Sequence, residues 1–332
     1  MVITRTPFRM SFFGGGTDYH QWYSKYGGAV LATSIDKYCY ITCRKLPPFF
    51  DHKHRIIYSK IETVKNNFQI QHPVVKAVLD WSNQKDGLEI HHDGDLPARS
   101  GLGSSSSFTV GLIHALNSLN GNYSNSKFLS QNAIHIERDV LRENVGSQDQ
   151  ISAAYGGFNL IKFSTDGSFD VDPVNISYSR KKDLEDSLML FFTGVSRYSS
   201  DIAKSTIANI DKQKEKFITL NQMVNEALEI LTNEEVSLDK FGELLNKSWE
   251  YKKSISNKIS TKKIDKIYNS AIESGAIGGK ILGAGGGGFI VFYVPKKFQV
   301  ALRNKLNDLV YVPFKFENTG STTVLNQPNG FN

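Results

Sequence analysis

The sequence of 332 residues contains only two cysteines, Cys39 and Cys43. They lie four residues apart in a stretch that alternates between polar and apolar residues, which predicts a strand. The rise of a strand would place the two thiols on one face, about 13 Å apart, which is too far for a disulfide within the strand. We therefore expect two buried free thiols and no disulfide framework.

Long hydrophobic runs are also missing. No segment reaches the apolar length of a membrane span, and residues 1–7 lack the apolar run of a signal peptide. These absences predict a cytoplasmic protein without a membrane partner. The hydrophobic fraction of 40% and the charged fraction of 22% are ordinary for a globular protein, and 332 residues suffice for two domains with separate cores.

A concentrated basic stripe is absent as well, although the formal net charge is +6. Lysines of the second half alternate with acidic residues on predicted helices, namely Lys212, Lys214, Lys216, Lys252, Lys253, Lys262 and Lys263. We interpret them as a solvated helix face and expect no nucleic-acid partner. A modest positive field would suit an anionic small substrate.

The most informative stretch is a loop rich in glycine and serine, residues 96–108. It follows a strand-like run, 88–92, and opens a helical pattern that continues to Leu119. Gly101 and Gly103 remove Cβ atoms next to the unpaired N–H groups of a helix N-terminus, which is a suitable place for a phosphate. The loop is not a Walker A motif, because GxxxxGK[ST] does not occur. A serine-capped helix after an ordinary turn is the alternative.

Two further loops could contact a ligand. A predicted strand from Arg9 to Phe13 runs into residues 14–19, where three glycines precede Asp18, an acceptor suited to sugar hydroxyls. A tight turn with an Asx cap is the alternative there. Residues 193–200 place Arg197 and several hydroxyls before a long helical pattern, which indicates either an anion site or a simple helix start.

Two acidic residues occupy unusual positions. Glu137 lies between apolar positions of the predicted helix 126–144, so its carboxylate needs a partner. A divalent metal could serve, and a salt bridge to Arg138 or Arg142 is the alternative. Asp149 lies just before a core element, where an acid can be held near a ligand, although it could equally cap a helix.

A third glycine run, residues 283–288, formally contains GxGxxG. A dinucleotide-binding fingerprint requires a helix next, whereas residues 290–294 are typical of a strand. A protein-kinase glycine loop is excluded too, because neither HRD nor DFG occurs in the sequence.

Together, these motifs resemble those of one family in order and spacing. Pro7-Phe8-Arg9 with residues 14–19, Pro97 with residues 101–105, and residues 280–288 resemble the three motifs of the GHMP family of small-molecule kinases, which includes galactokinase, homoserine kinase, mevalonate kinase and phosphomevalonate kinase. Residues 146–150 also look like the family's catalytic-aspartate segment. The resemblance implies transfer of a phosphoryl group from ATP.

The resemblance also implies an α+β fold of two domains. The first, 1–182, would be a domain of the ribosomal protein S5 domain 2 type, and the second, 183–332, would be ferredoxin-like. We place the boundary where the composition shifts, after the Lys/Asp-rich break at 180–186. ATP and substrate would lie between the two domains, and the resemblance also allows a homodimer.

Within the family, Gly15 and Gly16 stand where galactokinases carry a Glu-His pair that holds galactose, which argues against galactose. The GGGTD form, together with residues 193–197, most resembles the D-glycero-D-manno-heptose 7-phosphate kinases. These phosphorylate the anomeric hydroxyl, and their 1,7-bisphosphate product leads to activated heptose for bacterial surface polysaccharide. A fucokinase-like sugar kinase and a non-catalytic sugar and ATP sensor stay open as alternatives.

The resemblance assigns roles to individual residues. Asp149 would be the general base, and Arg9 its basic partner. The residues implied to bind ATP are Pro97, Arg99, Gly101, Leu102, Gly103, Ser104, Ser105 and Ser106. Mg²⁺ would be held by Ser104 or Ser105 together with Glu137. The residues implied to bind the phosphosugar substrate are Gly15, Gly16, Thr17, Asp18, Tyr19, Arg197, Gly285 and Gly286.

Overall fold

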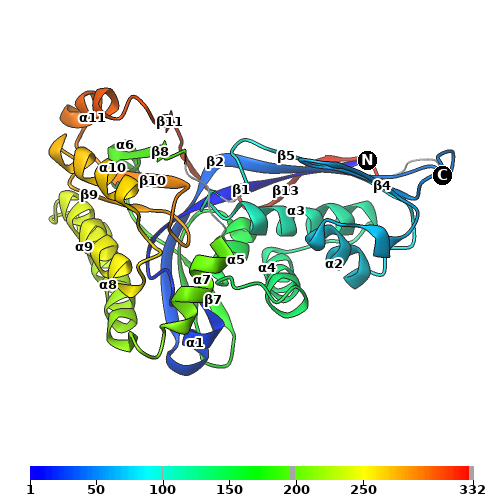
Figure 1. Cartoon of the computed structure of the whole chain (residues 1–332), viewed down its shortest axis with the longest axis horizontal. Coiled ribbons are helices and arrows are strands. Elements are labelled where there is room, and N and C mark those ends of the chain that lie inside the picture. The colour runs from blue at the N-terminus through cyan, green and yellow to red at the C-terminus, as the bar shows by residue number, and fades with distance from the viewer. Residues whose placement is uncertain (99, 195–198, 329–332) are drawn as a thin grey trace.

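The computed structural model describes residues 1–98, 100–194 and 199–328 of the chain, and these form two sheets flanked by helices (Figure 1). The larger sheet has nine strands, and the smaller has four antiparallel strands in the order β11-β8-β10-β9. Helices and strands are mixed in both parts, as the α+β expectation requires. Every helix of the described residues falls short of the length and apolarity needed to cross a membrane.

The larger sheet is built around β2 (Gly28–Lys45), which pairs with β1 (Val2–Phe13) along most of its length. The main strand order is β13-β1-β2-β5-β3-β4. The other strands are β3 (His54–Ile57), β4 (Ile61–Val64), β5 (Leu88–Gly94), β6 (Phe158–Phe163), β7 (Phe169–Pro173), β12 (Phe316–Glu317) and β13 (Thr322–Asn326). β6 pairs with the first part of β2 and β5 with its last part.

The polar residues within 34–37 do not divide β2, which is one continuous strand. Ser34 and Ile35 pair with both β1 and β12. Asp36 and Lys37 form an irregularity opposite Pro7 and Phe8, and the pairing with β1 resumes at Tyr38. Beyond them the side chains alternate, with Cys39 and Cys43 buried and Tyr38 half-buried on the other face. Both cysteines are buried free thiols, as expected, and burial raises the pKa of Cys43 to about 12.

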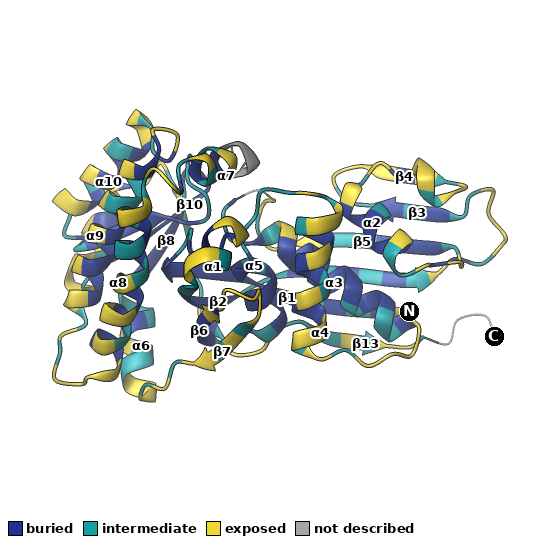
Figure 2. Cartoon of the chain, turned by 90° about the horizontal axis from the view of Figure 1, so that it is seen from below, coloured by how far each residue is buried: buried dark blue, intermediate teal, exposed yellow. Residues whose placement is uncertain are grey.

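One face of this sheet is covered by helices (Figure 2). They are α2 (Pro73–Trp81), α3 (Ser104–Leu119), α4 (Ser126–Ile134) with its π-helical continuation η2 (His135–Val140), and α5 (Gln148–Tyr155). α3 packs on β1 and β2 and is buried along most of its length. A Cβ on Gly111 would lie 2.9 Å from the Thr6 hydroxyl, so the absence of a side chain lets α3 approach β1 closely. The short α1 (His20–Tyr26) and η1 (Asn67–Gln69) lie in connections.

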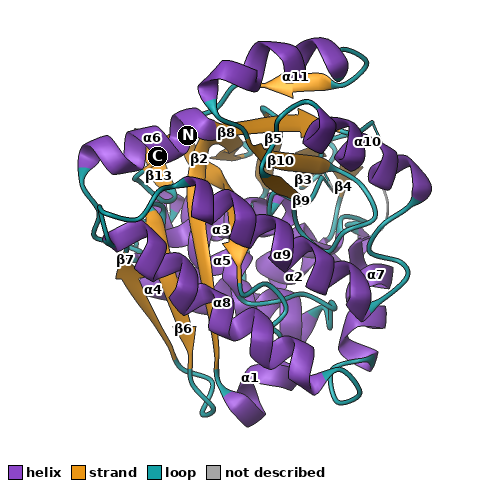
Figure 3. Ribbon diagram, turned by 90° about the vertical axis from the view of Figure 1, so that its left-hand side faces the viewer, coloured by secondary structure: helices purple, strands orange, loops and turns teal. Residues whose placement is uncertain are grey.

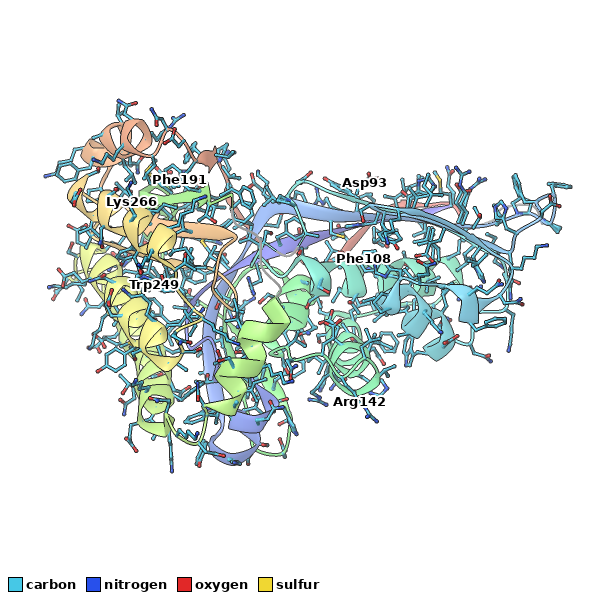
Figure 4. The ribbon with its side chains drawn as sticks, in the orientation of Figure 1. Asp93, Phe108, Arg142, Phe191, Trp249 and Lys266 are labelled. Atoms are coloured by element: carbon cyan, nitrogen blue, oxygen red, sulfur yellow. The ribbon has the colours of Figure 1, made fainter. Side chains whose placement is uncertain are left out.

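The smaller sheet contains β8 (Leu188–Phe192), β9 (Gly278–Ile281), β10 (Phe289–Tyr293) and β11 (Val310–Val312). Its helices are α6 (Tyr178–Ser187), α7 (Ser199–Ala208), α8 (Lys214–Thr232), α9 (Asp239–Ile255), α10 (Lys262–Glu273), η3 (Lys296–Phe298) and α11 (Gln299–Lys305). α9 packs against β9 and β10 (Figure 3). Phe191 on β8 and Trp249 on α9 are buried in this part, whereas Phe108 on α3 belongs to the other (Figure 4).

The end of the chain departs from the expected division into 1–182 and 183–332. β12 pairs with β2 and β13 pairs with β1, so residues 316–326 belong to the first sheet. A strand joins the sheet whose open edge it can complete, wherever it stands in the sequence. The expected boundary near 182 falls inside α6, and the division of the rest of the chain stays a prediction.

The Lys/Asp-rich stretch at 180–186 is also not a break, because it forms most of α6. Its Arg180 donates to three backbone carbonyls around the end of α8, those of Ile230, Leu231 and Val236, at 2.5, 2.7 and 2.6 Å. The last carbonyls of a helix have no partner within it, and a cation near them is favourable. Arg180 therefore fixes the end of α8 to α6.

We expect Arg180→Met to lower the free energy of unfolding by about 2 kcal/mol, because it leaves these partly buried carbonyls without their charged donor. Urea denaturation followed by circular dichroism would measure the change. Lys240→Met is the control, since its ion pair with Glu243 is exposed and should contribute little. Equal midpoints for Arg180→Met and the parent protein would contradict the assignment.

Candidate active site

Arg9 and Asp149 come from distant parts of the sequence and form a bidentate ion pair. Arg9 lies on β1, and its Nε and Nη2 donate to the Asp149 Oδ1 and Oδ2 atoms at 2.8 Å each. Its Nη1 donates to the Gly101 carbonyl at 2.7 Å. Arg9 is 3% exposed and Asp149 is 25% exposed, so one side of the carboxylate remains accessible. The alternative of Asp149 as a helix cap is wrong, because Ser147 holds the N-cap position of α5.

The loop rich in glycine and serine lies directly over this pair. Gly103, with φ 75°, is the N-cap residue of α3 and has no side chain to cap the helix. A Cβ on Gly103 would lie 3.2 Å from the Arg9 Cγ and 3.6 Å from the Asp149 carboxyl carbon. The backbone N–H of Arg9 donates to the Leu102 carbonyl at 3.0 Å. The start of α3 and the Arg9–Asp149 pair are therefore neighbours.

The remaining residues of this loop differ in exposure. Ser105 is exposed in the first turn of α3, and Pro97 is exposed before it, while Ser104 is partly buried. Arg99 lies outside the described residues. Ser106 is buried, and its hydroxyl donates inward to Glu137 at 2.8 Å. The structure thus brings Ser106 to Glu137, whereas the sequence assigned Ser105 or Ser104.

Glu137 is fully buried on the π-helical turn η2, a kind of turn found often at functional sites. Besides Ser106, it accepts hydrogen bonds from Thr109 and from the Gln150 amide, both at 2.5 Å. Burial raises the pKa of Glu137 to about 7. The alternative of a salt bridge to Arg138 is wrong, because that guanidinium pairs with Asp139 on the outer side of the turn.

The donors around Glu137 fit a magnesium ion. The Gln150 Oε1 atom is buried without a hydrogen-bond partner and lies on the side chain that contacts Glu137. Carboxylate, amide and hydroxyl oxygens are the ligands that Mg²⁺ prefers, and protein sites commonly supply only one or two carboxylates. The described residues contain no cluster of three or more acidic, histidine or cysteine side chains that could hold a metal by themselves. Phosphate oxygens would have to complete the coordination.

Asp18 is the charged residue of the GGGTD loop, and it contacts Gln148, the residue before Asp149. It is 2% exposed and accepts hydrogen bonds from the Gly16 N–H and from the Gln148 amide, at 2.8 and 2.9 Å. Burial raises the pKa of Asp18, and the nearby Asp149 carboxylate adds to the increase. A Cβ on Gly146 would lie 1.8 Å from Asp18 Oδ2, so only glycine fits there.

Other residues of this loop hold its shape. The Thr17 hydroxyl is fully buried and donates to the carbonyls of Gly14 and Ala29 at 2.8 and 2.9 Å. The structure therefore turns Thr17 away from a ligand, contrary to its predicted role, because a buried hydroxyl needs a local acceptor. Tyr19 is buried at the start of α1. Gly15 lies near the Gln148 side chain, and Gly16 lies against the Phe217 ring.

The third glycine run, residues 283–288, brings the smaller sheet into contact with the loop rich in glycine and serine, residues 96–108. A Cβ on Gly101 would lie 2.4 Å from the Leu282 carbonyl, and one on Gly288 would lie 2.2 Å from the Ser100 carbonyl. The two predicted substrate residues of the run, Gly285 and Gly286, instead contact the Ile259 carbonyl. Arg197 lies outside the described residues.

Sequence reasoning missed two lysines. Lys280 is 3% exposed, and its ammonium donates to the Phe12 carbonyl at 2.6 Å. Lys252 donates to the Gly283 carbonyl at 2.5 Å, so its interpretation as part of a solvated face is wrong. Burial lowers the pKa of Lys280 well below its usual range and lowers that of Lys252 to about 8. Helix periodicity alone cannot distinguish Lys252 from its solvated neighbours, whereas Lys280 lies three residues before the glycine run at 283–288.

Comparison with known proteins gives a consistent result. The model of the GHMP kinases N terminal domain matches residues 67–157, and that of the GHMP kinases C terminal domain matches residues 227–310. The D-glycero-alpha-D-manno-heptose 7-phosphate kinase of Campylobacter jejuni is 32% identical over 324 residues, covering 92% of this chain and 94% of that protein. The galactokinase of Pyrococcus furiosus is 26% identical and covers 89% of each chain.

Solved structures show the same fold. A D-glycero-D-manno-heptose 1-phosphate kinase from Bacteroides thetaiotaomicron superposes with a TM-score of 0.79 at 24% identity, covering 97% of this chain and 98% of that one. Lactococcus lactis galactokinase in complex with galactose gives a TM-score of 0.75 at 19% identity, covering 97% and 94%. Matches that span nearly the full length of each protein, at 32% identity for the Campylobacter enzyme, show that this chain belongs to the GHMP kinase family.

Proposed function

We propose that this chain is an ATP-dependent sugar kinase that phosphorylates the anomeric hydroxyl of D-glycero-D-manno-heptose 7-phosphate. One observation carries the proposal of catalysis, the bidentate pair of Arg9 and Asp149 beneath the start of α3. A sensor that only bound ATP and sugar would not need an oriented, partly accessible carboxylate beside a phosphate loop. The substrate is supported by the heptose 7-phosphate kinase of Campylobacter, which is similar over 94% of its length.

Asp149 is suited to accept the proton of the sugar hydroxyl. Its two oxygens each accept one hydrogen bond from Arg9, which fixes the plane of the carboxylate and leaves further lone pairs for the substrate. Arg9 also carries positive charge next to the position where charge would develop during transfer. General-base catalysis of this kind contributes about 10²–10⁴-fold to the rate.

The phosphates of ATP would bind at the N-terminus of α3, where backbone N–H groups and the absence of a side chain on Gly103 leave room for an anion. Ser106, Glu137 and Gln150 are the residues that would hold Mg²⁺. When bound with ATP, the ion neutralises charge on the phosphates. Asp18 would orient sugar hydroxyls, since Gln148 and the Gly16 N–H hold its carboxylate in place. Location in the cytoplasm and a homodimer stay predictions.

In a coupled ADP-release assay with Mg·ATP, we expect turnover with D-glycero-D-manno-heptose 7-phosphate and not with mannose, fucose, galactose or mannose 6-phosphate. Asp149→Asn should lower kcat about 10²–10⁴-fold, because the amide cannot accept the proton. Asp170→Asn, on exposed β7, is the control and should behave as the parent.

The panel also separates the alternatives. Turnover confined to an unphosphorylated sugar would keep the kinase and remove the heptose assignment. ATP binding with no turnover on any sugar would favour the sensor.

We expect Glu137→Gln to weaken the apparent affinity for Mg²⁺ about 10–100-fold at saturating ATP, because the amide keeps the shape of the side chain and removes its charge. Titration of Mg²⁺ in the same assay measures the effect, and excess Mg²⁺ should restore part of the rate. Asp139→Asn, which changes a carboxylate on the outer side of the same turn, is the control. An unchanged Mg²⁺ dependence in Glu137→Gln would exclude the metal role.

A further inference from the structure

Lys252 is the charged residue that α9 places at the edge of the site. Its Nζ atom donates to the Gly283 carbonyl at 2.5 Å. In the described part of the chain, Lys252 forms no ion pair with an acidic residue. Its one hydrogen bond there goes to this neutral carbonyl. An ammonium group has three N–H bonds, and two of those of Lys252 are therefore left for another acceptor.

A short series of contacts connects Lys252 to the catalytic carboxylate. A Cβ on Gly283 would lie 2.6 Å from the Gly101 Cα, so the backbones of the two glycine loops touch. The Gly101 carbonyl accepts a hydrogen bond from Arg9, and Arg9 holds Asp149. Gly283, Gly101 and Arg9 thus connect the ammonium to Asp149 through successive contacts.

The charges that face Lys252 come from several elements. Burial is the largest cause that lowers the pKa of Lys252, and the charge of Arg9 on β1 lowers it further. The carboxylates of Asp18 and Asp149 raise it. Lys280 on β9 is the other cation of this group, and the charge of Lys252 helps to lower the pKa of Lys280. Three basic groups and two carboxylates thus influence one another, so this group of side chains carries one positive charge more than it carries negative charges when all are ionised, which favours an anion.

Arg9 is less available for that anion than Lys252. Its Nε, Nη1 and Nη2 atoms all donate to protein acceptors, and two of these bonds are needed to orient Asp149. The anion present at this centre during reaction is the phosphoryl group that moves from ATP to the sugar, with charge on three equatorial oxygens.

We propose that Lys252 is a catalytic residue that donates hydrogen bonds to the oxygens of the transferred phosphoryl group. The inference rests on the proposed kinase function. A phosphate carried by the sugar itself has the same chemistry and is the competing source. The transferred group is favoured because the Gly283 loop that holds Lys252 touches Gly101, whose carbonyl binds Arg9, the partner of Asp149. A 7-phosphate is separated from an anomeric hydroxyl by most of the sugar chain.

Nucleotide binding tests this without a sugar, so its result does not depend on which sugar is the substrate. In Mg²⁺ buffer, Lys252→Gln should weaken binding of the non-hydrolysable analogue AMPPNP about tenfold and leave binding of ADP unchanged, because only the former carries a γ-phosphoryl group. Lys247→Gln, an exposed position on α9, is the control and should change neither. Equal effects on both nucleotides, or none on either, would overturn the proposal.

Steady-state kinetics with the best sugar of the panel give a second readout. Lys252→Gln should lower kcat about 10²-fold with little change in the sugar KM, and Lys252→Arg should restore part of the loss. An increase in KM confined to the phosphorylated sugar, with kcat unchanged, would assign Lys252 to the sugar's phosphate and overturn the proposal.

A pH profile separates this role from a purely structural one. With a pKa of about 8 in the free protein, the Lys252 ammonium is lost as the pH rises above 8, so kcat/KM of the parent should fall there. Lys252→Arg keeps its charge at these pH values and should lack the decline. An alkaline decline of the same shape in both proteins would show that loss of the Lys252 proton does not limit activity, which would contradict the proposed role.

Discussion

The close approach of two glycine loops is the constraint on which the site depends. Gly101 and Gly283 touch through their backbones, and any side chain at Gly101 would run into the Leu282 carbonyl. Both residues have positive φ, at 87° and 70°, which glycine adopts without strain. This contact brings the smaller sheet against the start of α3, so that groups from both parts of the chain surround one position.

Charge burial explains the chemistry of that position. Arg9, Asp18, Glu137, Lys252 and Lys280 are all removed from water to a large extent, and burial is the main cause of the shifted pKa values of the last four. Buried charges require partners that are held in place. Each of these groups has at least one hydrogen bond to a named partner, so the site is ordered before a ligand arrives, and little reorganisation is needed at the moment of transfer.

The fold supplies this order through a few long elements. β1 carries Arg9 and ends at the GGGTD loop, while α3 begins over Asp149 and runs along β1. A bulge between Pro7 and Phe8 interrupts the register of β1 just before Arg9, at a place where proline needs no ladder hydrogen bond. The returning strands β12 and β13 pair with β2 and β1, respectively, and so connect the end of the chain to the sheet that bears the site.

The sequence alone located the glycine-rich loops, because glycine spacing and hydrophobic periodicity are local properties, and the resemblance of these motifs to the GHMP kinases implied the family and the α+β class. It also singled out Asp149, Arg9, Glu137 and Asp18, and the roles proposed for them remain open to experiment. Tertiary structure decided which partners side chains meet: Ser106 rather than Ser105 contacts Glu137, and Lys252 contacts the Gly283 carbonyl instead of lying on a solvated face. It also decided that residues 316–326 join the first sheet. Such pairings depend on which segments pack together across the whole chain, and no local pattern records that.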